Sequence, residues 1–311
     1  MKIHKETSIQ RLRNPVISIG IFDGVHPGHA AVFNKVTGKA GEIGGDPAVI
    51  TFWPHPRLVL GKDHDNLKLL TSLEEKIELI ESHGIEHLFI LPFTKEFAQL
   101  PPCTFIKKYL VDGAGLKHLV FGYDHHFGRN REGSFENLKS CSRLYGFTLE
   151  QLEPLSRAGL RISSSAIRQA LFTGNVKLAS RLLSRHYGLQ GKIVGGKRIG
   201  RSIGYPTANV KPDDDNKLIP ADGVYAVRVL MEGKSLMGMM NIGVRPTIND
   251  VRDDKSLEVH IIDFTGDIYE RSIKIDFIDR IRDEKKFDNI DQLKEQLSRD
   301  RLAAIRILQD F

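Results

Sequence analysis

The sequence predicts an α/β domain followed by an antiparallel β-barrel domain. In the first half, short β-rich runs alternate with helical patterns, which is the rhythm of βαβ units and of a mostly parallel, doubly wound sheet. After Tyr187 the pattern changes to alternating strands separated by glycines, which is typical of an antiparallel barrel. At 311 residues the chain also exceeds the length that one core usually serves. We therefore expect two domains, residues 1–186 and 187–311.

The first half contains five strand candidates with helical segments between them. The segment LEEKIELIESHG (73–84) has the apolar spacing of an amphipathic helix, with Ser72 as its N-cap and Gly84 as its stop. Two further helices are expected at 164–172 and 176–185. The expected strands are 16–22, 48–53, 87–93, 118–123 and 147–152.

The second half is expected to form a barrel that ends in a helix. The final segment, roughly 289–309, carries Leu293, Leu297, Leu302 and Ile305 at helical spacing, and we expect it to pack over one face of the barrel. The expected barrel strands are 223–231, 235–243, 256–263 and 272–278.

Composition excludes several classes of protein. Hydrophobic residues make up 41% and charged residues 27% of the chain, which is typical of a globular protein. No signal peptide or membrane-spanning run is apparent, so a cytoplasmic enzyme is expected. The net charge of +6 would suit nucleic acid, but acidic residues are interleaved with the basic ones, and a polyphosphate-binding enzyme explains the charge equally well. Cys103 and Cys141 lie far apart, so neither a disulfide nor a zinc site is expected, and both are interpreted as small buried hydrophobic residues.

The segment GIFDGVHPGH (20–29) is the first candidate site, because it follows a strand and leads into a helix. Ligands bind at this position in open parallel sheets. Gly24 and Gly28 permit a close approach of the backbone, and the helix N-terminus favours an anion. His26 and His29 can reach the same phosphates and donate to charge that builds on a transferring phosphoryl group. The alternative, two surface histidines, does not explain the flanking glycines.

The segment RISSSAIR (161–168) is the second candidate phosphate-binding element. Ser163 or Ser164 is a natural N-cap, and small hydroxyl residues such as Ser165 leave the N–H groups of the helix start accessible. Arg168, about one turn into this helix, can reach the same phosphates. A plain capping sequence is the alternative.

Two further segments follow expected strands. In GYDHHFG (122–128), Asp124 is placed for a nucleoside or ribityl contact. A metal site with the adjacent histidines is disfavoured, because neighbouring side chains rarely bind one ion. In TFWPHP (51–56), the aromatic and proline residues, which precede or include His55 and Pro56, can form an apolar wall for a planar ring. Core packing of Phe52 and Trp53 is an equal alternative.

The barrel domain opens with GGKRIGRSIGYPTAN (195–209), which lacks the arrangement of a P-loop. Thr207 and Asn209 are two apart, so in an extended chain both offer oxygens to one Mg²⁺ ion. In LEVHI (257–261), Glu258 would lie on the face opposite the apolar residues and could act as a general base toward a substrate hydroxyl. An ordinary surface loop and an ordinary surface strand are the alternatives. The residues expected to wrap phosphates are Gly195, Lys197, Arg201 and Gly204.

Together these motifs resemble the prokaryotic bifunctional riboflavin kinase/FAD synthetase family over residues 16–303. GIFDGVHPGH, PHP, GYDHHFG and RISSSAIR resemble the adenylyltransferase half, which implies a Rossmann-like sheet. GRSIGYPTAN, DGVYAV, NIGVRPT, LEVHI and IRDEKKF resemble the kinase half. Ile21 stands where the family commonly has Asn, and His125 replaces a frequent aromatic residue.

The resemblance implies two ATP-dependent reactions. The C-terminal domain would phosphorylate riboflavin to FMN with Glu258 as base and Mg²⁺ held by Thr207 and Asn209. The N-terminal domain would then adenylylate FMN with a second ATP, giving FAD and diphosphate. The residues that would stabilise the charge are His26, His29, Arg161, Ser164 and Arg168. The rival hypotheses are another HxGH nucleotidyltransferase, which leaves the barrel motifs unexplained, and a riboflavin-dependent regulator that binds nucleic acid. The sequence does not give the oligomeric state.

Overall fold

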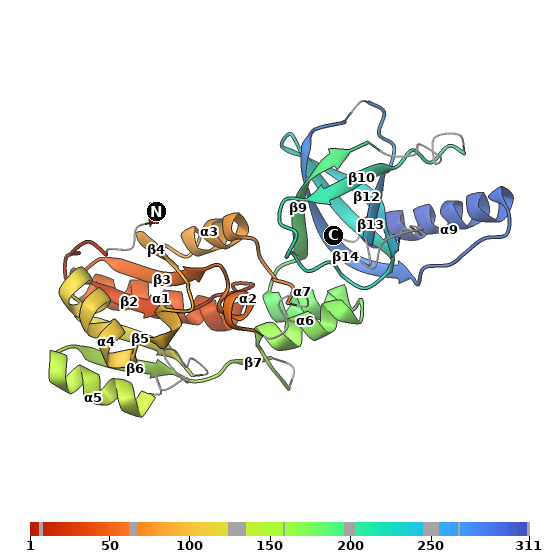
Figure 1. Cartoon of the computed structure of the whole chain (residues 1–311). Helices are drawn as coiled ribbons and strands as arrows, with labels where there is room; N and C mark the ends of the chain where they lie inside the picture. Colours follow the sequence, from red (N-terminus) through yellow and green to blue (C-terminus); the bar gives the residue numbers. More distant parts are fainter. Residues whose placement is uncertain are drawn as a thin grey trace. The chain divides into compact units, whose positions relative to one another are not determined.

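The computed structural model describes residues 1–5, 9–61, 67–123, 135–157, 159–195, 203–244, 255–266 and 268–309. The chain folds into two compact units, Met1–Ser164 and Ser165–Phe311, here called the N-terminal and C-terminal units. Figure 1 shows an α/β sheet in the first and a barrel in the second. The predicted succession of an α/β fold and a barrel is therefore confirmed.

The N-terminal unit is built on a six-stranded sheet with the order β1-β4-β3-β2-β5-β6, and all of its pairs are parallel. Its strands are β1 (Lys2–His4), β2 (Val16–Ile19), β3 (Pro47–Trp53), β4 (His87–Pro92), β5 (His118–Gly122) and β6 (Thr148–Leu152). From β2 the chain adds β3 and then β4 on one side, and it then returns to the other side of β2 to form β5 and β6. This reversal is the topological switch point at which such sheets bind ligands.

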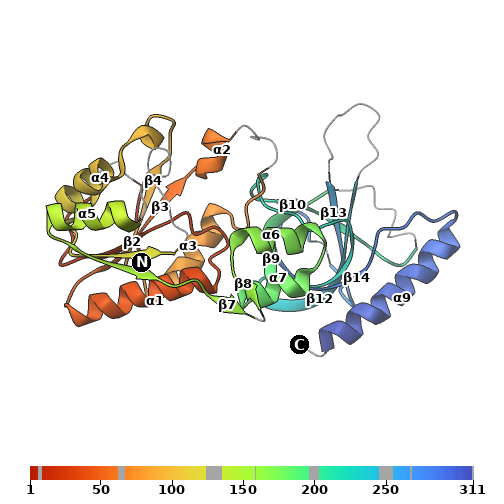
Figure 2. The same cartoon turned by 90° about the horizontal axis from the view of Figure 1, so that it is seen from below.

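Helices cover both faces of this sheet, because its central strands are buried on both sides. One face packs against α1 (Pro27–Glu42) and α3 (Leu73–Glu81), and the other against α4 (Pro102–Phe105), the π-helical segment η2 (Ile106–Ala114) and α5 (Phe135–Tyr145). Figure 2 shows α1 on the side of the sheet opposite α4 and α5. The remaining elements are α2 (Pro56–Leu60), the 3₁₀ turn η1 (Phe97–Gln99) and a hairpin of β7 (Ser156–Arg157) and β8 (Leu160–Arg161).

The sequence placed most of these elements correctly, with differences at their ends. Ser72 caps α3 in a capping box with Glu75, as expected, although α3 ends at Glu81, before Gly84. Strand β2 ends at Ile19 instead of residue 22, because Gly20 begins the turn that precedes α1. The expected strand thus included three residues that belong to the candidate site.

Cys103 and Cys141 form a disulfide bond, so the expectation of two separate buried thiols is wrong. Their Cα atoms lie 5.7 Å apart although 38 positions separate them in the sequence. The two cysteines belong to α4 and α5, which cover the same face of the sheet. Sequence spacing could not reveal this proximity, because it arises from helix packing.

The C-terminal unit is a closed antiparallel barrel with the order β10-β13-β12-β11-β14-β9. Its strands are β9 (Tyr187–Val194), β10 (Ala208–Pro212), β11 (Gly223–Met231), β12 (Lys234–Val244), β13 (Lys255–Ile261) and β14 (Ser272–Arg282). The helices α6 (Ser164–Phe172) and α7 (Val176–Leu183) precede the barrel, and α7 packs against β9 and β14. The predicted strands all occur, and β14 runs four residues further than expected, from 278 to 282.

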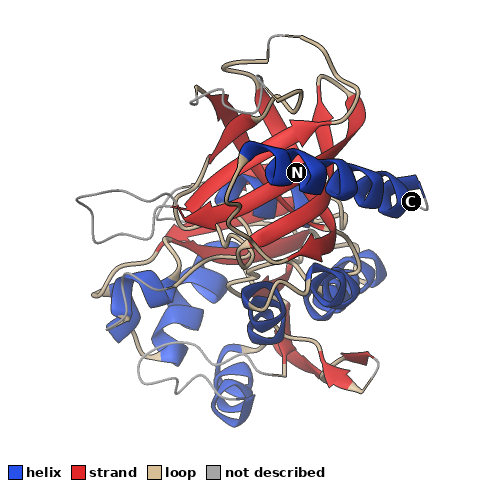
Figure 3. Cartoon of the chain, turned by 90° about the vertical axis from the view of Figure 1, so that its right-hand side faces the viewer, coloured by secondary structure: helices blue, strands red, loops and turns tan. Residues whose placement is uncertain are grey.

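The final helix α9 (Ile290–Gln309) lies across the outside of the barrel, as Figure 3 shows. Leu297 and Ile305 pack there with Ala304 and Leu308 against side chains of the barrel strands, which confirms the predicted packing. Leu302 was expected on the same stripe but is 61% exposed. It follows Leu297 by five residues, which places it about 140° around the helix from that residue.

Candidate active sites

The loop between β2 and α1 brings the predicted glycines and histidines of the N-terminal unit together. His26 is the N-cap of α1, and its Nδ1 accepts a hydrogen bond from the His29 N–H at 3.4 Å. The two imidazole rings stack with their centroids 3.7 Å apart. A Cβ atom at Gly28 would lie 3.0 Å from the His26 ring, so the glycine leaves room for it. Both histidines therefore lie at the start of α1, where the positive end of the helix dipole favours an anion.

The backbone of this loop has an unusual conformation. Gly24 has φ +82°, which glycine adopts without strain, but Phe22 and Val25 also have positive φ angles of 50° and 35°. Both side chains are buried, and the Phe22 ring meets the His29 ring edge to face at 5.2 Å. Packing therefore holds the loop in a conformation that its residues disfavour by themselves.

Asp23 connects the loop by hydrogen bonds to a segment that is distant in the sequence, and the sequence did not predict this role. Its buried carboxylate accepts hydrogen bonds from the N–H groups of Leu70 and Thr71 at 3.0 and 3.2 Å and from the Thr71 hydroxyl at 3.3 Å. The Thr71 hydroxyl oxygen also accepts from the Gly24 N–H at 3.2 Å. The only sequence signal was that Asp23 lies inside the motif, because its partners are 47 and 48 positions away.

The second predicted phosphate element meets the loop through Ser164. Its hydroxyl donates to the carbonyl oxygen of Asp23 at 2.9 Å. The Arg161 guanidinium lies over the ring of Tyr123, 5.3 Å from the ring centre. Tyr123 directly precedes Asp124 in the chain. Ser165 and Arg168 lie in α6 and belong to the C-terminal unit. Asp124 lies outside the described residues.

His55 and Pro56 follow β3, the strand next to β2. The His55 side chain caps the short helix α2, where its Nδ1 accepts from the Arg57 N–H at 3.1 Å, and Pro56 is the first helical residue. The peptide bond before Pro54 is cis. Of the aromatic residues that precede them, Phe52 packs in the core, whereas Trp53 is half-buried. Because β2, β3 and β5 are adjacent and parallel, the segments after them meet at one edge of the sheet.

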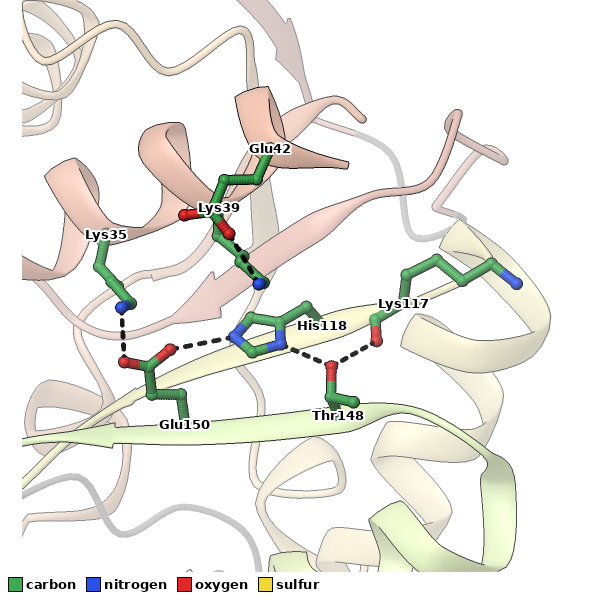
Figure 4. A network of polar contacts seen from close by, with 7 residues as sticks. All are labelled: Lys35, Lys39, Glu42, Lys117, His118, Thr148 and Glu150. Carbon is green, nitrogen blue, oxygen red and sulfur yellow. Dashed lines mark hydrogen bonds and ion pairs between the residues drawn. The ribbon is translucent and has the colours of Figure 1, made fainter. Parts of the chain in front are cut away.

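A polar network at the opposite edge is not part of this arrangement. His118 and Thr148 begin β5 and β6, and their side chains hydrogen-bond at 2.6 Å. Glu150 connects His118 to Lys35 of α1, as Figure 4 shows. Burial lowers the pKa of His118, and the nearby Glu150 carboxylate opposes this effect. The network lies at the amino ends of the strands, away from the segments that follow β2, β3 and β5.

In the C-terminal unit, strand pairing places a row of polar side chains on the outer face of the barrel. Glu258 of β13 stands opposite Asn209 of β10 on one side and Asn241 of β12 on the other. Directly paired residues point to the same face of a sheet. His260 follows Glu258 by two positions on β13 and therefore lies on the same face of the strand. It pairs with Met239, which packs against α9 on the outside of the barrel. The row Asn209–Glu258–Asn241 therefore faces outward.

Thr207 joins this row and also borders a cavity. Its hydroxyl donates to Oε2 of Glu258 at 3.3 Å, so the predicted metal ligands and the predicted base lie together. A cavity of about 660 Å³ adjoins Thr207, and most of its lining residues are apolar or aromatic, Phe264 and Tyr269 among them. Its lining residues are Pro206, Thr207, Ala208, Val259, Ile261, Phe264, Thr265, Gly266, Ile268 and Tyr269. The sequence alone did not predict this cavity, because the segment 262–269 carries no recognisable motif.

The predicted phosphate-wrapping loop is only partly described. Gly195 and Gly204 lie at its two ends, both exposed, and Gly204 has φ +84°. Lys197 and Arg201 lie outside the described residues. Within the described ranges, no group of three His, Cys, Asp or Glu side chains could hold a metal ion. A hydroxyl, an amide and a carboxylate oxygen are nevertheless a donor set that fits Mg²⁺, since this ion commonly keeps water and takes phosphate oxygens as its other ligands.

Comparisons with known proteins cover both units. The family model for FAD synthetase matches residues 8–166, and the family model for riboflavin kinase matches residues 183–308. The bifunctional riboflavin kinase/FMN adenylyltransferase of Bacillus subtilis (strain 168) is 40% identical over 298 residues, which are 95% of this chain and 93% of the relative. The enzyme of the same name from Escherichia coli (strain K12) is 38% identical and covers 93% of this chain and 91% of its own length.

A solved structure from Streptococcus pneumoniae, described as a macrolide-efflux protein, has a TM-score of 0.89 and is 32% identical. It covers 97% of this chain and 98% of its own. Among the described residues of the present chain, none of the helices combines the length and the apolar character that crossing a membrane requires.

Proposed function

Because the chain belongs to the family of bifunctional riboflavin kinase/FMN adenylyltransferases, we propose that two separate sets of residues perform its two reactions. The protein is an enzyme that phosphorylates riboflavin with ATP and then joins the resulting FMN to a second ATP, which yields FAD and diphosphate. We place the functional boundary at 186/187, because the first barrel strand begins at Tyr187. The boundary between the two compact units lies after Ser164 and instead assigns α6 and α7 to the barrel.

In the kinase reaction, Glu258 takes the proton from the 5′-hydroxyl of riboflavin as that oxygen attacks the γ-phosphorus of ATP, and ADP leaves. Thr207 and Asn209 would hold Mg²⁺, which neutralises phosphate charge when it is bound. The observation that supports this assignment is the 3.3 Å contact between Thr207 and Glu258, opposite Asn209. The cavity beside Thr207 offers two aromatic rings to the adenine base, so we place the nucleotide there, with Gly195, Lys197, Arg201 and Gly204 near its phosphates.

In the transferase reaction, a phosphate oxygen of FMN attacks the α-phosphorus of ATP and diphosphate leaves. His26 and His29 donate hydrogen bonds to the charge that develops on the transferring group, at the helix end where Gly24 and Gly28 admit the phosphates. Arg161, Ser164, Ser165 and Arg168 would bind the same phosphates, Asp124 would contact the nucleotide or flavin, and His55 and Pro56 would border the flavin ring. No covalent intermediate is required, because positioning and electrostatics supply the acceleration.

Two substitutions test the separation of the sites. Glu258→Ala should abolish the formation of FMN from riboflavin but leave the conversion of supplied FMN to FAD, and His29→Ala should do the reverse. Products are separated by chromatography after incubation with ATP and Mg²⁺. Glu232→Ala, at the β11–β12 turn, and His4→Ala, on the edge strand β1, are matched controls that should leave both reactions unchanged. A substitution at either site that stops both reactions in a folded protein would contradict the proposal.

A cytoplasmic location is also part of this proposal, because both reactions consume ATP, which is supplied there. A disulfide such as the one between Cys103 and Cys141 is uncommon in that reducing compartment. The redox state of the two cysteines in intact cells, measured by thiol labelling, therefore bears on this part of the proposal. We do not propose nucleic acid or a membrane as a partner.

A further inference from the structure

Lys76 of α3 is a buried cation that neither reaction has so far required. Its side chain is only 1% exposed, which is rare for lysine. The Nζ atom lies over the Trp53 ring, 5.3 Å from its centre, at a distance suited to a cation–π contact. Burial lowers the pKa of Lys76 to about 8, and the negative charge of Asp23 opposes this effect. Lys76 therefore contacts an aromatic ring and interacts electrostatically with a carboxylate.

The two groups that interact with Lys76 come from two different segments of the candidate transferase site. Asp23 belongs to the loop of His26 and His29, and its carboxylate binds that loop to residues 70 and 71. Those residues directly precede α3, so the partner segment of Asp23 and the helix that carries Lys76 are continuous. Trp53 ends β3 and leads into the turn of His55 and Pro56, which we have assigned to the flavin ring.

We propose that Lys76 is a positioning residue for FAD synthesis. Its ammonium group attracts Asp23 of the histidine loop and the ring of Trp53, and it thereby fixes the separation between that loop and the turn that follows Trp53. This inference rests on the proposed function of the N-terminal unit. The first loop would bind the triphosphate of ATP and the second would border the flavin of FMN, so their separation sets the distance between the attacking phosphate and the α-phosphorus. Errors of about 1 Å in such a distance can cost a hundredfold in rate.

A purely structural role is a poor explanation for a lysine at this position. A buried charge is costly to desolvate, and well-packed apolar side chains often replace buried ion pairs without loss of stability. The neighbours of α3 in the core are apolar and would accept methionine, which has a similar length. An ammonium group adds what methionine lacks, namely attraction to both a carboxylate and an aromatic face. The structure therefore favours a role in placing those two groups.

The test compares Lys76→Met with Lys76→Arg, which keeps the charge, and with Lys139→Met, an exposed lysine of α5, as control. The rate of FAD formation from FMN is measured as kcat and KM, and urea unfolding followed by the fluorescence of Trp53, the single tryptophan of the chain, shows whether the N-terminal unit of each variant is folded. We expect Lys76→Met to lower kcat by between about tenfold and a hundredfold. Lys76→Arg should recover at least part of the loss, and the kinase reaction and Lys139→Met should match wild type.

Asp23→Asn provides a second route, because it removes the partner charge but keeps an oxygen for the N–H groups of residues 70 and 71. Asp23→Asn should lower kcat for FAD formation. The double variant with Lys76→Met should lose less kcat than the product of the two single fold-losses, because both substitutions remove the same interaction. If Lys76→Met fails to fold, the kcat of Asp23→Asn for FAD formation decides whether the inference holds. A wild-type kcat in either folded variant, or equal losses with methionine and arginine, overturns the inference. A wild-type protein that makes no FAD would instead refute the proposed function.

Discussion

Replacing Lys76 by methionine is expected to stabilise the N-terminal unit at pH 7 while it slows FAD synthesis. The lowering of the lysine pKa from 10.5 to about 8 means that the folded state disfavours the charged form by about 3 kcal/mol. Methionine does not carry this penalty. Asp23 would not be left without partners, because it keeps its hydrogen bonds from Leu70 and Thr71.

The sign of the pH dependence follows from the direction of the shift. Between about pH 8 and 10.5 the unfolded chain still binds a proton at Lys76 that the folded state has released, so wild-type stability from this group rises with pH. Below pH 8 both states are protonated and the penalty is fully present. The advantage of Lys76→Met should therefore be about 3 kcal/mol at pH 7 and should shrink by about 2 kcal/mol at pH 9.5.

The assay uses a property of the sequence. The chain has one tryptophan, Trp53, which lies in the N-terminal unit beside Lys76. Urea unfolding followed by tryptophan fluorescence therefore reports on this unit alone, and Lys139→Met serves again as control. Lower stability of Lys76→Met at pH 7, or a difference that does not change between pH 7 and 9.5, would refute the reasoning.

Three further predictions concern other parts of the chain. Gly24→Ala should lower FAD formation and leave FMN formation unchanged, because φ +82° costs alanine about 1–2 kcal/mol and its Cβ would lie 2.7 Å from a leucine side chain; both products are measured by chromatography. Asp300→Ala should destabilise the C-terminal unit by about 3–5 kcal/mol, because it removes the buried carboxylate that forms a bidentate ion pair with Arg282. Calorimetry measures this loss of stability. Cys103→Ser should lower the free energy of unfolding by up to about 4 kcal/mol, the loop-entropy value for a 38-residue separation from Cys141. Dithiothreitol should weaken the wild type similarly but not this variant.

The sequence predicted the order and type of the main elements well, because their apolar periodicity is strong. The capping box of Ser72 and the alternation around Glu258 are local patterns, and the structure contains both. The end of β2 was misplaced because Ile21 and Phe22 continue an apolar run that the chain uses in a turn. Leu302 was assigned to the packed stripe of α9 by spacing to its neighbours, although only the barrel decides which stripe is covered.

The parts of the site that were missed all depend on contacts between distant residues. Asp23 accepts hydrogen bonds from residues 47 and 48 positions later, and Lys76, in the helix that follows them, interacts with it electrostatically. Asn241 joins Glu258 only through the register of β12 on β13, which no single strand reveals. Single-sequence patterns identify residue types at suitable spacing, whereas these relations are created by folding.

The strained turn around Phe22 and Val25 limits how the phosphate-binding loop could be reused in protein engineering. Copying residues 20–29 onto another strand–helix junction would not reproduce its shape, because two of its bulky residues have positive φ angles that only their surroundings enforce. A transplant would also need the segment that donates hydrogen bonds to Asp23 and the β3 threonine whose hydroxyl donates to the Ile21 carbonyl. The smallest portable unit is therefore the loop together with two neighbouring segments of the N-terminal unit, not the ten-residue motif.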